Sequence, residues 1–224
     1  MRKKLFFFTI LLFSKSITYS QKSDNGNWWM YFGNQKLSEK VNWHNEVQHR
    51  NYNIAGDLQQ LLLRTGLGYN LSENNNNILL GYGYIKAKNY IANTNQKIET
   101  NEHRIYQQYI TKQSFGRFYL QHRYRIEERF LSTGFQLRFR YFFGLNIPLN
   151  QKTMDKKSIY LSAYNEVMLN AQSNFFDQNR LYGALGYVIN KNFRFELGFM
   201  NQTMQTNHRN QFQVALFNTL PLKK

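Results

Sequence analysis

Histidine, serine and carboxylate side chains are the groups in this sequence that could carry out catalysis. Nucleophilic catalysis needs a hydroxyl within hydrogen-bond reach of a base. On a strand, a His and a Ser two residues apart point to the same face. The chain has five histidines, and none of them is followed two residues later by Ser. We therefore expect no catalytic residue and no enzyme; a membrane-embedded enzyme that acts on lipid, with His122 as its base, is the alternative.

A metal or cofactor site has little support in the sequence. The chain has no cysteine, so a metal would need His together with Asp or Glu. His44 and Glu46 share one strand face, but the sequence identifies no third ligand. The asparagines at 74–77 lack the alternating acids of a calcium loop. We expect neither a metal nor a cofactor.

Arginine and glutamate at alternate positions form the strongest polar pattern. Arg123, Arg125 and Glu127 follow one another at every second residue, which places them on one face of a strand. Buried charges are costly unless they are paired, so we expect a connected interior network in a narrow barrel. Its candidate members are Glu46, Arg50, Arg64, Glu102, Arg104, Arg123, Arg125, Glu127, Arg138, Arg140, Glu166, Arg180 and Glu196. The surplus of arginine predicts further bonds to carbonyls, tyrosines or water, and could make the lumen attract anions.

Two short blocks near these residues could have a more specific role. They are Asp177–Arg180 and Glu127–Arg129. Our interpretation is that both blocks fix where their strands end and how these strands align with their neighbours.

The elements that must position these side chains are strands, because apolar residues recur with a period of two. The expected strands cover residues 27–32, 41–50, 61–69, 78–87, 102–111, 117–127, 135–145, 159–169, 180–189, 193–199 and 211–216. This is about eleven strands. Because single-chain bacterial barrels use even numbers, the sequence predicts an antiparallel up-and-down transmembrane barrel of 10–12 strands, with twelve as the best guess. The longest polar break, Lys88–Asn101, is expected to be a surface loop.

The first residues have the form of an export signal. Arg2, Lys3 and Lys4 precede an apolar run over residues 5–13, and small residues at 18 and 20 precede Gln21. We expect residues 1–20 to be a cleaved signal peptide and residues 21–224 to form one barrel domain.

The formal net charge is +16. Nucleic acid could explain such a surplus, but export and the scattering of the arginines argue against it, so no nucleic-acid partner is expected.

Alternation leaves open which face of the strands is inside. A soluble lipocalin-like barrel in the periplasm, binding an apolar ligand, would turn its apolar face inward, whereas a membrane barrel turns it toward lipid. The 19 Phe and 16 Tyr residues and the two signs of charge on the polar face favour the membrane. We therefore expect an outer-membrane protein of a Gram-negative envelope that is structural or weakly transporting. Its partners would be outer-membrane lipid and the barrel-assembly machinery, with no solute identified.

Local blocks along the chain support this interpretation through a resemblance. They are Trp28–Tyr31, Glu46–Arg50, Arg64–Tyr69, Gly81–Tyr84, Glu102–Arg104, Gln121–Phe130, Arg138–Tyr141, Asn165–Glu166, Phe176–Arg180 and Gly198–Gln202. These blocks resemble the outer-membrane-barrel proteins of domain-of-unknown-function family number 2490. The resemblance implies an outer-membrane barrel and supplies no activity. The chain departs from many such barrels in lacking a terminal aromatic residue, which implies an internal or atypical insertion signal.

Overall fold

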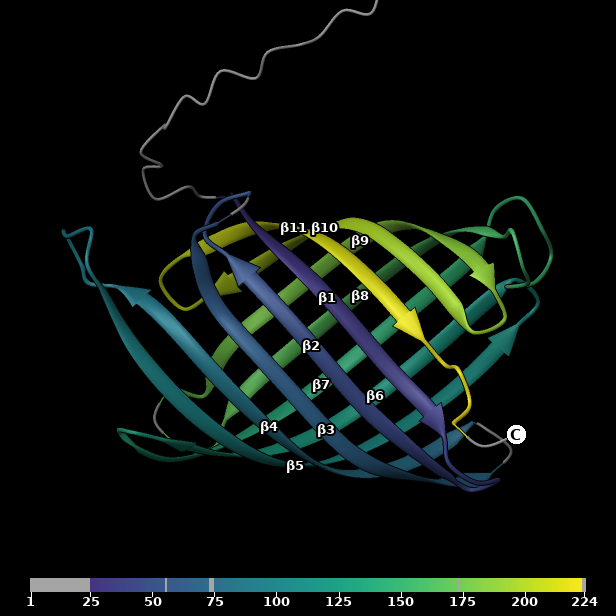
Figure 1. Cartoon of the computed structure of the whole chain (residues 1–224), viewed down its shortest axis with the longest axis horizontal. Coiled ribbons are helices and arrows are strands. Elements are labelled where there is room, and N and C mark those ends of the chain that lie inside the picture. The colour runs from purple at the N-terminus through teal and green to yellow at the C-terminus, as the bar shows by residue number, and fades with distance from the viewer. Residues whose placement is uncertain (1–24, 55, 73–74, 173, 223–224) are drawn as a thin grey trace, which may run out of the picture.

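The structure is a computed structural model that describes residues 25–54, 56–72, 75–172 and 174–222. These residues form one closed barrel of long, tilted strands (Figure 1). The strands are β1 Asn25–Lys36, β2 Val41–Asn51, β3 Leu58–Ser72, β4 Asn76–Tyr90, β5 Lys97–Phe115, β6 Phe118–Leu131, β7 Gly134–Pro148, β8 Ile159–Asn170, β9 Phe176–Asn190, β10 Phe193–Met204 and β11 His208–Asn218. The expected signal peptide at residues 1–20 lies outside the described residues.

The all-β, up-and-down architecture is confirmed, but the best guess of twelve strands is wrong. Each strand pairs antiparallel with its neighbours along the chain. The described residues contain eleven strands, and an odd number of up-and-down strands leaves the first and last running in the same direction. β1 and β11 therefore close the barrel as a parallel pair, from Asn25 opposite Asn210 to Gly33 opposite Asn218. We call this parallel pair the seam.

The connections between strands define two rims. The N-side rim is where β1 begins, and the C-side rim is where β11 ends. The expected loop Lys88–Asn101 is wrong in extent, because β4 continues to Tyr90 and β5 starts at Lys97. Lys88 lies opposite Glu99 in this extended hairpin, and Lys86 forms an ion pair with Glu99 at 2.6 Å. Cross-strand charge pairs thus keep polar residues in strand conformation.

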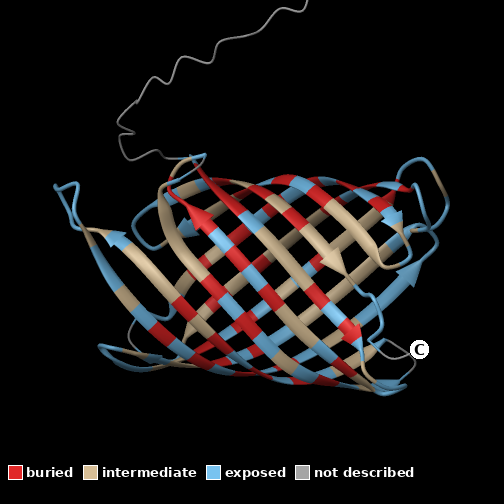
Figure 2. Ribbon diagram, in the orientation of Figure 1, coloured by how far each residue is buried: buried red, intermediate tan, exposed pale blue. Residues whose placement is uncertain are grey.

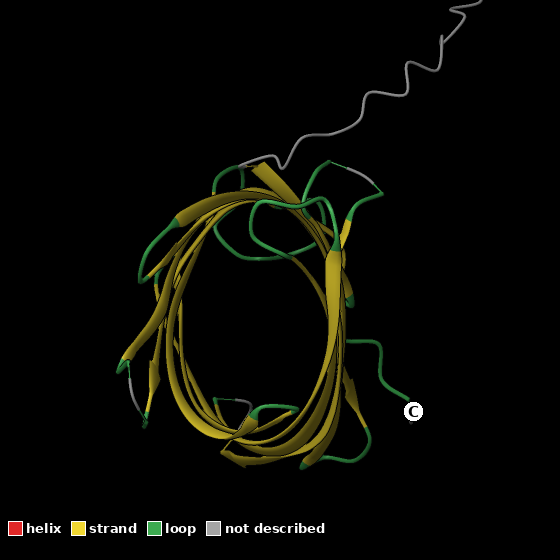
Figure 3. Ribbon diagram, turned by 90° about the vertical axis from the view of Figure 1, so that its left-hand side faces the viewer, coloured by secondary structure: helices red, strands yellow, loops and turns green. Residues whose placement is uncertain are grey.

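Burial alternates along the strands (Figure 2). The buried positions hold most of the arginines and glutamates together with some apolar side chains such as Leu62 and Ile85, whereas many large apolar side chains are exposed. On β9, for example, Arg180 and Tyr182 are buried while Leu181 and Leu185 are exposed. The view along the barrel shows one ring of strands (Figure 3). The described residues include no helix long and apolar enough to cross a membrane. Buried side chains such as Tyr106, Arg125 and Glu127 occupy part of the space inside this ring, and the strand period decides which residues point there.

Candidate functional site

The most buried charge of the barrel is the carboxylate of Glu127, on the inner face of β6. Its side chain has no solvent exposure. Five arginines, supplied by β3, β5, β6 and β7, lie 2.5–3.5 Å from its oxygens: Arg64, Arg104, Arg125, Arg138 and Arg140. Because β6 lies between β5 and β7, the alternating positions of all three strands point at the same part of the lumen.

Three further carboxylates extend this cluster around the barrel. Glu166 pairs with Arg123, Arg140 and Arg180, Glu102 pairs with Arg104 and Arg129, and Glu46 pairs with Arg64. Arg64, Arg104 and Arg140 each contact Glu127 and one other carboxylate. The result is one continuous set of ion pairs, which we call the arginine–carboxylate network. In a site of low dielectric such a network is stable only because each charge has partners.

Twelve of the thirteen expected interior residues are buried, and Arg123 is partly buried, but two of the thirteen have other partners than expected. Glu196 accepts hydrogen bonds from the hydroxyls of Tyr160 at 2.8 Å and Tyr182 at 3.3 Å, and no arginine pairs with it among the described residues. Arg50 donates to Gln48 and lies over the ring of Trp28, 3.7 Å from its centroid. Tyrosine, glutamine and tryptophan side chains thus stabilise the charges of Glu196 and Arg50, which have no partner of opposite charge in the network.

Three network contacts were missed in the sequence, for different reasons. Arg129 binds Glu102 and lies two residues after Glu127, so the strand period could have found it. Gln108 accepts a hydrogen bond from Arg125 at 2.9 Å and also falls on an inward position, but a pattern of charged residues does not identify a neutral partner. Asp177 pairs with Arg138 at 2.9 Å although its position in the alternation points outward. A register shift between β8 and β9 falls at this residue, and such a bulge re-aims a side chain.

The two blocks that were expected to fix strand ends, on β6 and β9, both contribute side chains to the interior ion pairs. Asp177 and Arg180 bind Arg138 and Glu166, and Glu127 and Arg129 belong to the arginine–carboxylate network. Glu128 instead points outward, where its carboxylate accepts from Gln107 at 3.1 Å.

A cavity of about 470 Å³ occupies the C-side part of the lumen. Its floor includes Glu46, Arg64, Arg140 and Glu166 of the network, and its lining reaches Thr219 at the C-side rim. Residues on the other side of the network, such as Arg104 and Arg138, do not line it. We call this space the C-side cavity; the network closes it toward the N-side rim.

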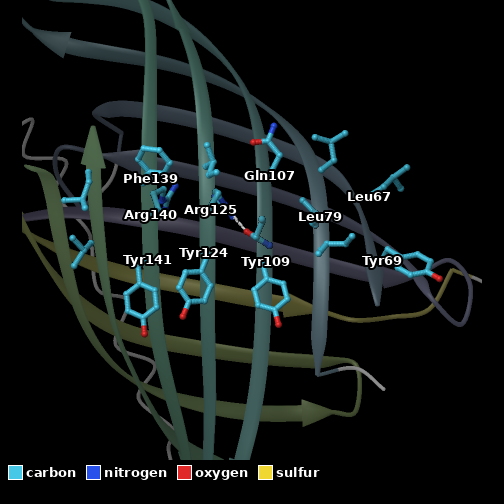
Figure 4. A pocket seen from close by; sticks show the side chains of 16 residues that line it. Leu67, Tyr69, Leu79, Gln107, Tyr109, Tyr124, Arg125, Phe139, Arg140 and Tyr141 are labelled. Atoms are coloured by element: carbon cyan, nitrogen blue, oxygen red, sulfur yellow. Dashed lines mark hydrogen bonds between the residues drawn. The ribbon is translucent and has the colours of Figure 1, made fainter. Parts of the chain in front are cut away.

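The outer wall carries a row of tyrosines. Tyr109, Tyr124 and Tyr141 lie side by side on β5, β6 and β7 with their hydroxyls pointing the same way (Figure 4). Neighbouring ring centroids are 6.3 and 5.1 Å apart. His122 lies on this outer face too, with Nδ1 2.9 Å from the Tyr141 hydroxyl and its ring against Phe143. This histidine packs among aromatic rings, away from the interior charges.

A second polar cluster ties two loops together at the N-side rim. Asp57, in the β2–β3 loop, accepts a hydrogen bond from the Tyr90 hydroxyl at 2.8 Å and pairs with Lys97 at the start of β5. The ammonium of Lys97 lies over the ring of Tyr52. Burial raises the pKa of the Tyr52 hydroxyl above its ordinary value.

Among the described residues, no group of three or more His, Cys, Asp or Glu could hold a metal ion.

Comparison with known proteins gives one family. The family model described as "Protein of unknown function (DUF2490)" matches residues 25–213, which cover all of the barrel except the end of β11. No curated protein matches the chain.

Proposed function

This chain belongs to the DUF2490 family of proteins of unknown function, and we propose that it is an outer-membrane β-barrel with a structural or at most weakly transporting role. The observation that carries the proposal is the inverted distribution of residues, with charges inside and large apolar side chains outside. Its partners would be the surrounding lipid and, during insertion, the barrel-assembly machinery.

The outer wall supports insertion into hydrocarbon. Leu80, Leu185 and Phe199, on three different strands, are 61%, 58% and 68% exposed. Soluble monomers seldom expose connected apolar surface on this scale, because contact with water costs free energy in proportion to apolar area. The soluble periplasmic alternative would require this side of the strands to face inward. A closed barrel also leaves no unpaired strand edge, which hydrocarbon demands.

The filled lumen supports a structural role over free transport. The arginine–carboxylate network links β2, β3, β5, β6, β7, β8 and β9 across the interior. On its N-side, Met200 and Gln211 are each only 1% exposed. A solute would have to break several buried ion pairs to pass, and each broken pair leaves an unpaired charge.

Insertion is tested by folding the purified protein into vesicles of phosphatidylcholine. A membrane barrel resists extraction by carbonate and migrates faster on a gel before heating than after. Protein that folds fully in buffer without lipid or detergent, and stays in the soluble fraction, would contradict the proposal. A planar bilayer then tests the lumen, where we expect no steady ion current; regular open-channel steps would refute a closed interior.

A further inference from the structure

The C-side cavity has in its lining three positive side chains without an ion pair among the described residues, namely Lys112, Arg194 and, at the rim, Lys191. Lys112 of β5 and Arg194 of β10 line it, and these strands lie on opposite sides of the ring of eleven. Among the described residues neither side chain forms an ion pair, in contrast to the arginines of the network. Two like charges that share a cavity repel each other, and an anion between them would relieve this.

The carboxylates that line the cavity do not provide that anion, because each already has partners. Glu46 pairs with Arg64, Glu166 with three arginines, and Glu196 accepts from two tyrosines. The positive charge at Lys112 and Arg194 is therefore left for a group from outside the chain.

Aromatic rings form the wall beside Arg194. The guanidinium of Arg194 lies over the ring of Phe217, 4.2 Å from its centroid. Phe217 in turn stacks on Phe32 across the seam, with ring centroids 5.0 Å apart. All three residues line the C-side cavity.

A second aromatic row forms the wall on β7, β8 and β9. Phe142, Tyr164 and Tyr182 follow one another with centroids 5.0 and 4.6 Å apart. Arg123 lies over Phe142 at 4.5 Å. These rings also line the cavity. Offset or edge contact with such rings favours a flat aromatic partner.

The size and shape of the space suit a small molecule. Its volume of about 470 Å³ lies in the range of ordinary ligand pockets, roughly 300–1,000 Å³. Its lining reaches Asn192 and Thr219 at the C-side rim, whereas the network forms its floor. A ligand would enter from one side only.

We propose that the C-side cavity binds an aromatic organic anion, that is, a carboxylate or sulfonate on a flat apolar body. The anionic group lies between Lys112 and Arg194, and the ring packs against the aromatic walls. This inference goes beyond the proposed function, which concerns the outer wall and the closed N-side of the lumen.

Calorimetric titration with naphthalene-2-sulfonate tests the inference on the full barrel in phosphatidylcholine nanodiscs. We expect saturable binding to the unaltered protein. The double variant Lys112→Gln/Arg194→Gln should bind at least about tenfold more weakly, because two charge-assisted contacts are lost. Lys156→Gln is the matched control, since Lys156 is exposed in the β7–β8 loop at the same rim and does not line the cavity. Its affinity should equal that of the unaltered protein.

A neutral probe separates recognition of the anion from partition into lipid. We expect 2-naphthol to bind more weakly, and the double variant not to change its binding. Equal affinity of the sulfonate for the unaltered and double-variant barrels would overturn the inference, as would absence of binding. Each sample is first shown to migrate as a folded, heat-modifiable barrel, so absence of binding leaves the proposal of a membrane barrel intact. If the barrel instead fails to enter lipid, the same titration in a detergent solution still decides whether the cavity binds the anion.

Discussion

Arg140 donates a hydrogen bond from Nη1 to Oε1 of Glu127 at 2.6 Å, and the two side chains are only 5% and 0% exposed. The same arginine donates through Nη2 to Glu166 at 2.6 Å. β6, β7 and β8 are thus joined through the lumen as well as through their backbones. The stability of the barrel should therefore depend on single charges in its interior.

Glu127→Gln should lower the free energy of unfolding by about 3–5 kcal/mol, the usual cost of breaking a buried ion pair. The reason is that several buried arginines lose the charge they share. Denaturant unfolding of the barrel in lipid vesicles measures this. Glu128→Gln is the control, because this neighbour points outward, and its effect should stay within about 0.5 kcal/mol. Equal unfolding midpoints for the two variants would count against a structural role for the network.

Leu185→Arg should destabilise the barrel in a bilayer by about 2–4 kcal/mol, the cost of Arg near the middle of a lipid-facing wall. Leu185 is 58% exposed, and its neighbours on both sides, Leu161 and Leu197, are exposed apolar residues too. Ile54→Arg is the control, because Ile54 is 79% exposed but lies in the β2–β3 loop. If water surrounded both positions, both substitutions would be neutral. Equal free energies of unfolding for the two variants in vesicles would therefore refute the assignment of Leu185 to a lipid-facing wall.

Gly186→Ala should destabilise the barrel by about 1–3 kcal/mol through overpacking. A Cβ at Gly186 would overlap the ring of Tyr160, whose hydroxyl holds Glu196. Gly183→Ala, on the same strand, meets no atom within 4 Å and should be neutral or slightly stabilising. Thermal or denaturant unfolding of the two variants compares them directly. A larger loss at Gly183 than at Gly186 would contradict the packing of Tyr160.

The seam can be tested with an engineered disulfide, since the chain has no cysteine of its own. Met30 lies opposite Ala215 in the parallel pair, so Met30→Cys/Ala215→Cys should cross-link on mild oxidation. A non-reducing gel of unfolded protein would show a faster band that a reductant removes. The control, Met30→Cys/Gln211→Cys, moves one partner four residues along β11, roughly 13 Å away, and should not cross-link. Efficient cross-linking of the control alone would refute the register of the seam.

The interior was largely predictable from the sequence because one rule, the period of two, decides which side chains share a face. Arg123, Arg125 and Glu127 illustrate this, since their spacing alone placed them together on one face of a strand. The rule fails at Asp177, where a bulge adds a residue and changes the direction of the side chain. The period of two also does not predict which side chains contact each other across strands. The contact of Glu196 with Tyr160 and Tyr182, for example, depends on the register between strands.

The closure of the barrel was not predictable by the same reasoning. Local alternation gave about eleven strands, and a general preference for even numbers raised the best guess to twelve. Pairing of β1 with β11 joins the two ends of the chain in space, and no local pattern reports on it. The hairpin of β4 and β5 was underestimated because Lys88 and Glu99 look polar in sequence, although they lie opposite each other in the sheet.

Because β1 and β11 run parallel in the seam, the two ends of the barrel domain lie at opposite rims. Eleven up-and-down strands bring the chain in at Asn25 on one rim and out at Asn218 on the other. With a bilayer around the barrel, an epitope placed just before Asn25 and another just after Asn218 would therefore be exposed to different compartments. An antibody that cannot cross the envelope of an intact cell would reach one of them and miss the other.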